Sequence, residues 1–356
     1  MPTAQELVDA QIAAARAVSD RLGAAVDELR AAYVTISAHL ATNATLTAEV
    51  ASLKARIIEL ETQVPKPISR ILMGMATEDS LWTQRVALTG PVACERVFEP
   101  TWDIPGLVRR VQEAHGRGLV PIASIKSRMT PLEAPATNWA AQVSGSWDSR
   151  FRELARVLNA LGYPVWFSQD HEPRGGGIDT VQELKPWADA RARQFEIMRS
   201  EMGESSLVKV GPIDNGHPWG QRWGNLSDAS LSVYYSARLL AASHYLSGDF
   251  YDGATNTNVG EPAWVKMKAF QAWADRIGFD GPLGVGEWNF VTGDDCRATW
   301  PILNTDRWAF ACLFNSDQNN RTDLPTSIGG SWSLKPGTDR LAAFREILDL
   351  ASIPGR

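Results

Sequence analysis

Short apolar runs alternate with longer amphipathic stretches from Ile68 onward, and this alternation constrains the fold more than any other feature. Eight runs have the length and composition of buried strands: Ile68–Ala76, Cys94–Phe98, Leu119–Ile125, Pro164–Gln169, Leu207–Gly211, Asp249–Gly253, Leu283–Glu287 and Ala309–Asn315. Helical patterns lie between most of them: Pro105–Arg117, Ser149–Leu161, Val181–Glu201, Ser232–Leu246 and Pro262–Ile277. Eight strands with crossover helices in about 290 residues predict an α/β fold, the (β/α)8 or TIM barrel.

A doubly wound open sheet is the main alternative, because it shows the same alternation. Such a sheet commonly carries a glycine-rich phosphate-binding turn after its first strand. No G-x-G-x-x-G follows the first strand here, and Gly175-Gly176-Gly177 lacks the strand–turn–helix setting of a phosphate loop. We therefore expect the barrel, and we expect no cofactor.

Residues 1–64 differ in composition from the rest of the chain, with no Trp, no Pro after Pro2 and a single Gly. Apolar residues recur there at alternating spacings of four and three: Leu22, Val26, Leu29, Tyr33, Ile36 and Leu40, then Leu46, Val50, Leu53, Ile57, Leu60 and Val64. This seam predicts an α-helical coiled-coil stalk that self-associates as a dimer or trimer. The alternative is an amphipathic helix folded back on the next domain. Prolines at 65 and 67 end the helix, so 65–67 is a linker and 68–356 the barrel.

Composition excludes several classes of function. The net charge is −6 and no long basic run is present, which argues against a nucleic-acid partner. No apolar stretch reaches the roughly 20 residues needed for membrane insertion, and the first residues show no secretory signal. Cys94, Cys296 and Cys312 have no metal-type spacing and are expected to be reduced thiols of the core, as in a protein made in the cytoplasm.

Two of the predicted strands lead directly into glutamates, Glu172 after the fourth strand and Glu287 at the end of the seventh. Active sites of such barrels lie at the carboxyl ends of the strands, so the two carboxyl groups should meet there. A retaining glycosidase needs this pair. Glu172 would be the acid/base, its pKa raised by the nearby charge and by partial burial, and Glu287 the nucleophile, kept ionised by hydrogen bonds. Alternatively, each is a structural or surface carboxylate.

A metal site is not expected. The ring of strand-end residues holds too few histidines for a transition metal, and no second His follows His171-Glu172 at the spacing of a zinc protease. A cation bound by oxygen ligands near Asp294–Asp295 is the alternative, but a solvated loop fits that segment better.

The barrel resembles the clan A glycoside hydrolases, and family 26, the β-mannanase-like group, most of all. The resemblance rests on His171-Glu172 after the fourth strand, on Gly286-Glu287 in the seventh and on Gly248–Gly253 in the sixth. It implies that His171 holds the substrate or orients Glu172, and that Tyr251 lies near the nucleophile. Pro173-Arg174 departs from the Met-Asn that mannanases usually have there. The Arg174 cation favours an acidic or phosphorylated glycan.

The chain has 14 Trp, and sugar rings pack on flat indole faces. The residues expected to contact substrate are His171, Arg174, Tyr251, Asp252, Trp102, Trp219, Trp223 and Trp288. Core packing is the alternative for every Trp. Trp139 and Trp147 lie in a long third loop, Met129–Asp148, that is either a lid or a surface excursion.

A glycan-cleaving barrel on an oligomeric stalk, without a secretory signal, fits a virion component. We expect a bacteriophage minor tail protein, made in the host cytoplasm, whose barrel binds and cleaves a polysaccharide of the bacterial surface. One alternative is a receptor-binding barrel that recognises the glycan without cutting it. Another is a purely structural tail subunit.

Overall fold

The computed structural model describes residues 11–12, 18–29, 71–130, 132, 138–173, 181–219, 227–252, 261–317 and 331–351. The chain divides into two compact units, Met1–Ile68 and Ser69–Arg356. In the first unit, residues 18–29 are helical, and Val18, Leu22 and Val26 are exposed on that helix. The rest of the expected stalk and the linker 65–67 lie outside the described residues.

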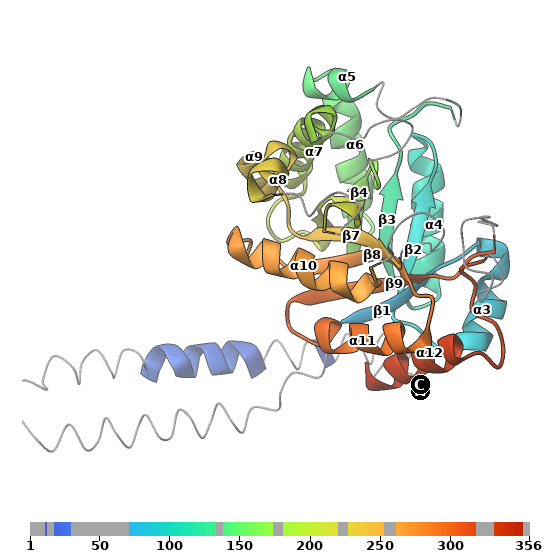
Figure 1. Cartoon of the computed structure of the whole chain (residues 1–356). Helices are drawn as coiled ribbons and strands as arrows, with labels where there is room; N and C mark the ends of the chain where they lie inside the picture. The colour runs from blue at the N-terminus through green and yellow to red at the C-terminus, as the bar shows by residue number, and fades with distance from the viewer. Residues whose placement is uncertain are drawn as a thin grey trace, which may run out of the picture. The chain divides into compact units, whose positions relative to one another are not determined.

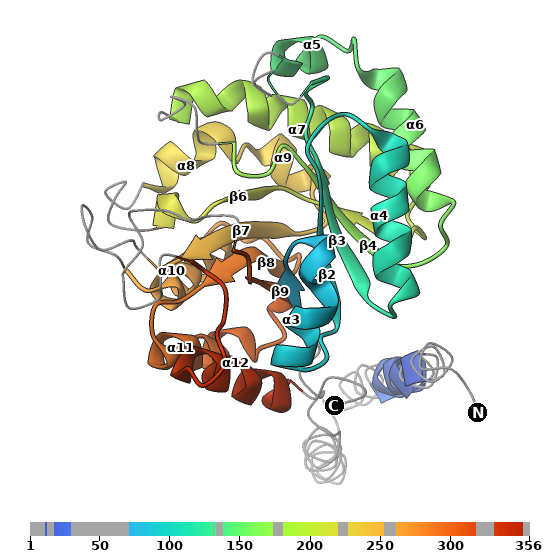
Figure 2. The same cartoon turned by 90° about the vertical axis from the view of Figure 1, so that its right-hand side faces the viewer.

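The described part of the second unit contains one sheet of nine parallel strands, which curls so that helices surround it (Figures 1 and 2). The strands are β1 (Leu72–Ala76), β2 (Cys94–Glu99), β3 (Val120–Ile125), β4 (Val165–Gln169), β5 (Val208–Val210), β6 (Ile213–Asn215), β7 (Leu246–Tyr251), β8 (Leu283–Asn289) and β9 (Trp308–Phe314). Their order in the sheet is β5-β4-β3-β2-β1-β9-β8-β7-β6.

The two edge strands, β5 and β6, are consecutive in the chain and separated only by Gly211 and Pro212. Gly211 N donates to Phe167 O in β4 at 3.1 Å, and His244 N, just before β7, donates to Val210 O at 2.7 Å. One segment therefore binds both ends of the sheet, as the fifth strand of a TIM-like barrel does. Pro212 interrupts the ladder because it has no N–H.

Helices follow most strands and cover the outer face of the sheet. They are α3 (Trp82–Thr89), α4 (Ile104–Gly116), α5 (Trp139–Val143), α6 (Asp148–Asn159), α7 (Val181–Met202), α8 (Asp228–Tyr234), α9 (Ala237–Ala242), α10 (Ala263–Arg276), α11 (Gly293–Leu303) and α12 (Asp339–Leu350), with short 3-10 helices at Asp79–Leu81 and His217–Trp219. Their apolar sides and the outward side chains of the strands form the main core, in which Trp187, Phe195 and Trp273 are buried. No helix in the described ranges combines the length and apolar character that a membrane crossing requires.

The expected α/β fold, with a curled parallel sheet of the TIM type, is confirmed. The expected helix Ser232–Leu246 is wrong in detail, because the chain forms α8 and α9 there and then enters β7 at Leu246. Ser236 breaks the pattern by taking an extended backbone conformation and capping α9 through a hydrogen bond from Leu239 N at 3.2 Å. The solvated loop expected at Asp294–Asp295 is instead the first turn of α11, capped by Thr292.

Candidate active site

Glu172 follows strand four of the sheet and Glu287 lies on strand seven, counted with β5 and β6 as one. Glu172 is the third residue after β4, and its N–H donates to Ile213 O in β6 at 3.1 Å. Glu287 lies inside β8, which continues to Asn289, and pairs in register with Asp249 of β7. Both carboxyl groups therefore belong to the carboxyl end of the sheet, where the sequence placed them.

The two glutamates interact electrostatically. Burial and, after it, the negative charge of Glu172 raise the pKa of Glu287 from its ordinary 4.5 to about 7. Three groups oppose this rise: the guanidinium of Arg96, the hydroxyl of Tyr251 and the ammonium of Lys126. The expectation that hydrogen bonding keeps Glu287 ionised therefore needs correction, because desolvation by burial outweighs the hydrogen bond. Near neutral pH, Glu287 is poised between its two protonation states.

Tyr251 is the direct neighbour of Glu287, since its hydroxyl donates a hydrogen bond to Glu287 Oε2. This is the place that the family resemblance implied. The ring packs against Phe314 at 5.9 Å and Trp332 at 5.5 Å between centroids, which holds the phenol in position. Burial and the charge of Glu287 raise the pKa of Tyr251 well above its ordinary value, so the hydroxyl stays a donor.

His171 lies between the strand end and Glu172. Its Nδ1 is 2.9 Å from Ser124 Oγ, and its ring centroid is 5.2 Å from that of Phe98. Burial, followed by the charges of Lys126 and Arg96, lowers the pKa of His171 well below its ordinary value. The imidazole is therefore neutral near pH 7 and can accept or donate one hydrogen bond to a substrate.

Three charged side chains that interact electrostatically with Glu172 or Glu287 were left out of the site expected from the sequence. Arg96 is 2% exposed and stacks on Phe98, with its Cζ atom 4.4 Å from the ring centroid. Lys126 donates to the backbone oxygen of His171, and burial lowers its pKa. Asp249 is 3% exposed, and burial together with the charge of Glu287 raises its pKa well above the ordinary value. The signal for Arg96 was its inward position between Cys94 and Phe98 in an otherwise buried strand.

Asp252 joins the first residue of α10 to the segment that follows β8. Its Oδ1 accepts from Ala263 N and its Oδ2 from Val291 N, both at 2.6 Å. Burial raises its pKa to about 6. The side chain is 5% exposed and both oxygens are used, so the structure gives it a bracing role where the sequence suggested sugar contact.

Two of the four expected aromatic platforms are buried in the core. Trp288 is fully buried, with Phe290 at 5.3 Å and Phe344 of α12 at 6.2 Å. Trp219 is 4% exposed, and its ring lies 4.6 Å from that of Phe270. Neither presents a face to a sugar. The reason for Trp288 is strand alternation, which turns it away from the side that Glu287 faces.

Of the remaining expected sugar contacts, Trp102 lies in the described part of the chain. Trp102 is half-buried and meets Trp147 edge-on at 4.9 Å, so part of its surface stays open. Trp223 and Arg174 lie outside the described residues. Trp147 and Trp139 are buried, which rules out a solvent-exposed platform for either in this conformation.

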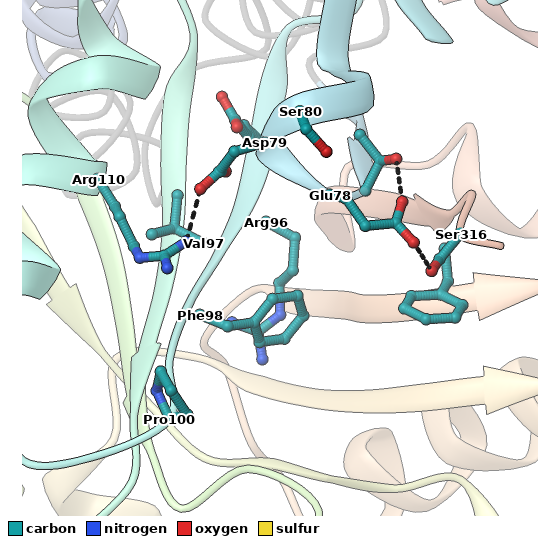
Figure 3. A pocket seen from close by; sticks show the side chains of 12 residues that line it. Glu78, Asp79, Ser80, Arg96, Val97, Phe98, Pro100, Arg110 and Ser316 are labelled. Atoms are coloured by element: carbon teal, nitrogen blue, oxygen red, sulfur yellow. Dashed lines mark hydrogen bonds and ion pairs between the residues drawn. The ribbon is translucent and has the colours of Figure 1, made fainter. Parts of the chain in front are cut away.

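A cavity of about 520 Å³ lies at the carboxyl ends of β1, β2 and β9 (Figure 3). Its lining includes Glu78, Asp79, Arg96, Phe98, Phe314 and Ser316. Glu78 accepts hydrogen bonds from Thr77 Oγ1 at 3.0 Å and from Ser316 Oγ. Asp79 accepts from Arg110 Nη1 at 2.7 Å. Phe98 contacts His171 and Phe314 contacts Tyr251, so two of the lining residues touch side chains that neighbour the carboxyl pair.

The lining mixes charged and hydroxyl groups with two aromatic rings, a composition suited to a polyhydroxylated ligand. Within the described ranges, no group of three or more His, Cys, Asp or Glu side chains has a metal-binding arrangement. The carboxyl groups of Glu172 and Glu287 can supply acid–base and nucleophilic chemistry.

Comparison with solved structures identifies similar folds. A fungal β-1,4-galactanase matches 77% of this chain and 99% of its own, with a TM-score of 0.52 and 9% sequence identity. A modular endo-β-1,4-mannanase from Cellulomonas fimi, of glycoside hydrolase family 26, matches 80% of this chain and 71% of its own at a TM-score of 0.50 and 15% identity. A glucosidase from Croceicoccus marinus matches 80% and 68%, also at 0.50 and 15%.

The likeness is one of fold. By name the three are a galactanase, a mannanase and a glucosidase, and identities this low carry the architecture but not the substrate. The sequence itself matches no protein-family model and no curated protein.

Proposed function

We propose that the barrel is a retaining glycoside hydrolase, with Glu287 as nucleophile and Glu172 as acid/base. The observation that carries the proposal is the placement of these two glutamates after β4 and within β8 at the carboxyl end of the sheet, with the Tyr251 hydroxyl donating to Glu287. Tyr251 beside Glu287 and His171 beside Glu172 support the assignment. The similarity of fold to glycoside hydrolases is consistent with it.

The proposed reaction requires the protonated form of Glu172 and the ionised form of Glu287. Glu172, protonated, gives its proton to the leaving oxygen while the ionised Glu287 attacks the anomeric carbon. The bond to the leaving oxygen breaks, and a glycosyl ester with Glu287 forms. Water then attacks this ester, and Glu172 takes the proton from the water. Positive charge that develops on the sugar favours the ionised form of Glu287, as Arg96 and the Tyr251 hydroxyl do.

The cavity at the carboxyl ends of β1, β2 and β9 would hold one end of the glycan. Its volume lies within the range of about 300–1,000 Å³ usual for ligand sites. Glu78 and Asp79 can accept hydrogen bonds from sugar hydroxyls, and Phe98 and Phe314 offer apolar surface. The substrate class proposed is a polysaccharide of a bacterial cell surface. Arg174 suggested an acidic glycan as substrate. The acidic lining residues Glu78 and Asp79 do not support that preference.

The proposed setting is a bacteriophage tail, with the protein self-associated through residues 1–64. Support comes from the heptad seam and from the exposed Val18, Leu22 and Val26 of the described helix. Immunodetection in purified virions tests the setting. Detection only in soluble host extracts would contradict it.

The activity is tested by incubating the protein with mannan, arabinogalactan and peptidoglycan and measuring released reducing ends. We expect release by the wild type and by E153Q, which changes an exposed glutamate of α6, and almost none by E172Q or E287Q. Binding without release by the wild type would instead favour the receptor-binding barrel. Absence of both binding and release would favour a structural subunit.

A further inference from the structure

The carboxylate of Asp170, just after β4, is surrounded by donors from three elements. Its Oδ1 accepts from Ser127 N at 2.6 Å. Its Oδ2 accepts from Ser127 Oγ at 2.6 Å and from Trp139 Nε1 of α5 at 3.0 Å. Asp170 is 1% exposed, so these are desolvated, charge-assisted hydrogen bonds, which are stronger than neutral ones.

Helix α7 completes the surroundings of Asp170. Arg191 Nη2 lies 3.6 Å from Oδ2 and is fully buried, which balances the carboxylate charge. Trp187 Nε1 donates to the backbone oxygen of Asp170 at 3.0 Å. Arg191 also donates to Gln142 of α5, so α5 and α7 are joined behind Asp170. We call Ser127, Trp139, Trp187 and Arg191 the Asp170 clamp.

The clamp holds a backbone that is unfavourable for these residues. Asp170 has a φ of 48° and Glu172 a φ of 52°, and these two are the non-glycine residues with positive φ in the described chain. Non-glycine residues adopt this region infrequently, Asp more readily than Glu, and surrounding contacts help to hold them there. The same segment is fixed by two backbone bonds, Asp170 N to Ile125 O at 2.9 Å and Glu172 N to Ile213 O at 3.1 Å.

We propose that Asp170 is a positioning residue that aims Glu172 at the substrate, and that α5 (Trp139–Val143) acts as its brace. Trp139 of the third loop is buried and donates to Asp170. We therefore assign it this bracing role in place of a lid or a sugar platform. The catalytic consequence rests on the proposed function, whereas the structural claim stands without it.

Hydrogen exchange of the backbone amides tests the structural claim without any substrate. S127A removes one hydroxyl donor, and W139F removes the indole donor while keeping an aromatic ring. W147F is the matched control, since Trp147 is buried in the same region and its ring packs on Trp102 and Phe151. We expect the amides of residues 170 and 172 to exchange about tenfold faster in S127A and W139F, and at the wild-type rate in W147F.

Unchanged exchange in both clamp variants would overturn the proposal. Equal acceleration in W147F would also overturn it, because it would mark a general loosening of the fold. S127A removes a single atom, so it keeps the test valid if W139F fails to fold.

The catalytic role proposed for Asp170 is tested by comparing substrates whose leaving groups differ in their need for a proton. A displaced acid slows glycosides whose leaving oxygen needs a proton, but not activated aryl glycosides, which leave without one. We expect kcat of S127A to fall about tenfold on the glycan, with KM within about twofold, and to stay near wild type on the aryl glycoside. Equal losses on both substrates would overturn the positioning role. A wild type inactive on every glycan would instead refute the proposed function, and the exchange result would still decide the structural claim.

Discussion

Tyr251 and Glu287, on the adjacent strands β7 and β8, are joined by a hydrogen bond in which the phenol hydroxyl donates to Glu287 Oε2. This bond lowers the pKa of Glu287, while burial and the charge of Glu172 raise it. The protonation of Glu287, the proposed nucleophile, therefore depends on two opposing groups: the Tyr251 hydroxyl on β7, which lowers its pKa, and the Glu172 carboxylate after β4, which raises it. Changes to either partner should move it in opposite directions.

Y251F should shift the acidic limb of the pH–activity profile to higher pH. Loss of the hydroxyl leaves Glu287 without the donor that favours its ionised form, so its pKa rises above about 7. We expect kcat/KM at pH 7 to fall by about 10–100-fold. A pH series of kcat/KM checks this, with Y163F as control, because Tyr163 stacks on His115 away from the pair. A profile that only drops in height would show that Tyr251 does not tune Glu287.

E172Q should shift the same limb to lower pH. Removing the negative charge that raises the pKa of Glu287 lets it ionise more easily. The measurement needs an activated aryl glycoside, since the variant lacks its acid and should lose about 10²–10⁴-fold in kcat on a glycan. An unchanged or higher pKa for the limb in E172Q would mean that the two carboxyl groups are not coupled.

E287Q should stabilise the fold, and more so at higher pH. The pKa of Glu287 is about 7 when folded against 4.5 ordinarily, so the folded state binds more protons between these values. The free energy of unfolding therefore falls as pH rises from about 4.5 to 7, by up to about 3 kcal/mol from this group. Gln carries no charge to desolvate, so urea unfolding should show E287Q gaining on wild type from pH 5 to pH 8. A constant difference across this range, like that expected for E153Q, would contradict the raised pKa.

The barrel and the position of both glutamates could be predicted because strand-and-helix alternation and strand-end acids are local signals. The role of Trp288 could have been read from alternation, since the residue after an inward Glu287 must face outward. Trp219 could not, because its burial against Phe270 depends on how a 3-10 helix lies over α10. Arg96 was missed because a charged residue in a strand is ordinarily exposed, whereas here it points into the interior.

Substitution of Gly211 tests whether the β5–β6 segment closes the sheet. A Cβ atom there would overlap the backbone oxygen of Tyr245, which cannot move without disturbing the start of β7. G211A should therefore lower the free energy of unfolding by about 1–3 kcal/mol. G116A, in α4 with open space around the position, should be neutral or stabilising by up to about 1 kcal/mol. Equal effects in denaturant titrations would mean that the segment does not close the sheet as described.

The proposed stalk makes a prediction about mass in solution. L22D and V26D together place charges on the exposed apolar face of the helix at 18–29, where a coiled coil would bury them. Sedimentation should show a dimer or trimer for the wild type and for D20A, and a monomer for the double variant. A monomeric wild type would refute self-association.

The central claim, nucleophilic attack by Glu287, is tested most directly by trapping the covalent intermediate. E172Q, lacking the base that activates water, should accumulate the glycosyl ester when given an aryl glycoside of the sugar that the wild type cleaves. Mass spectrometry after acid quench is predicted to show one added sugar on the peptide that contains Glu287. An unmodified protein, or a sugar on any other peptide, would contradict the account.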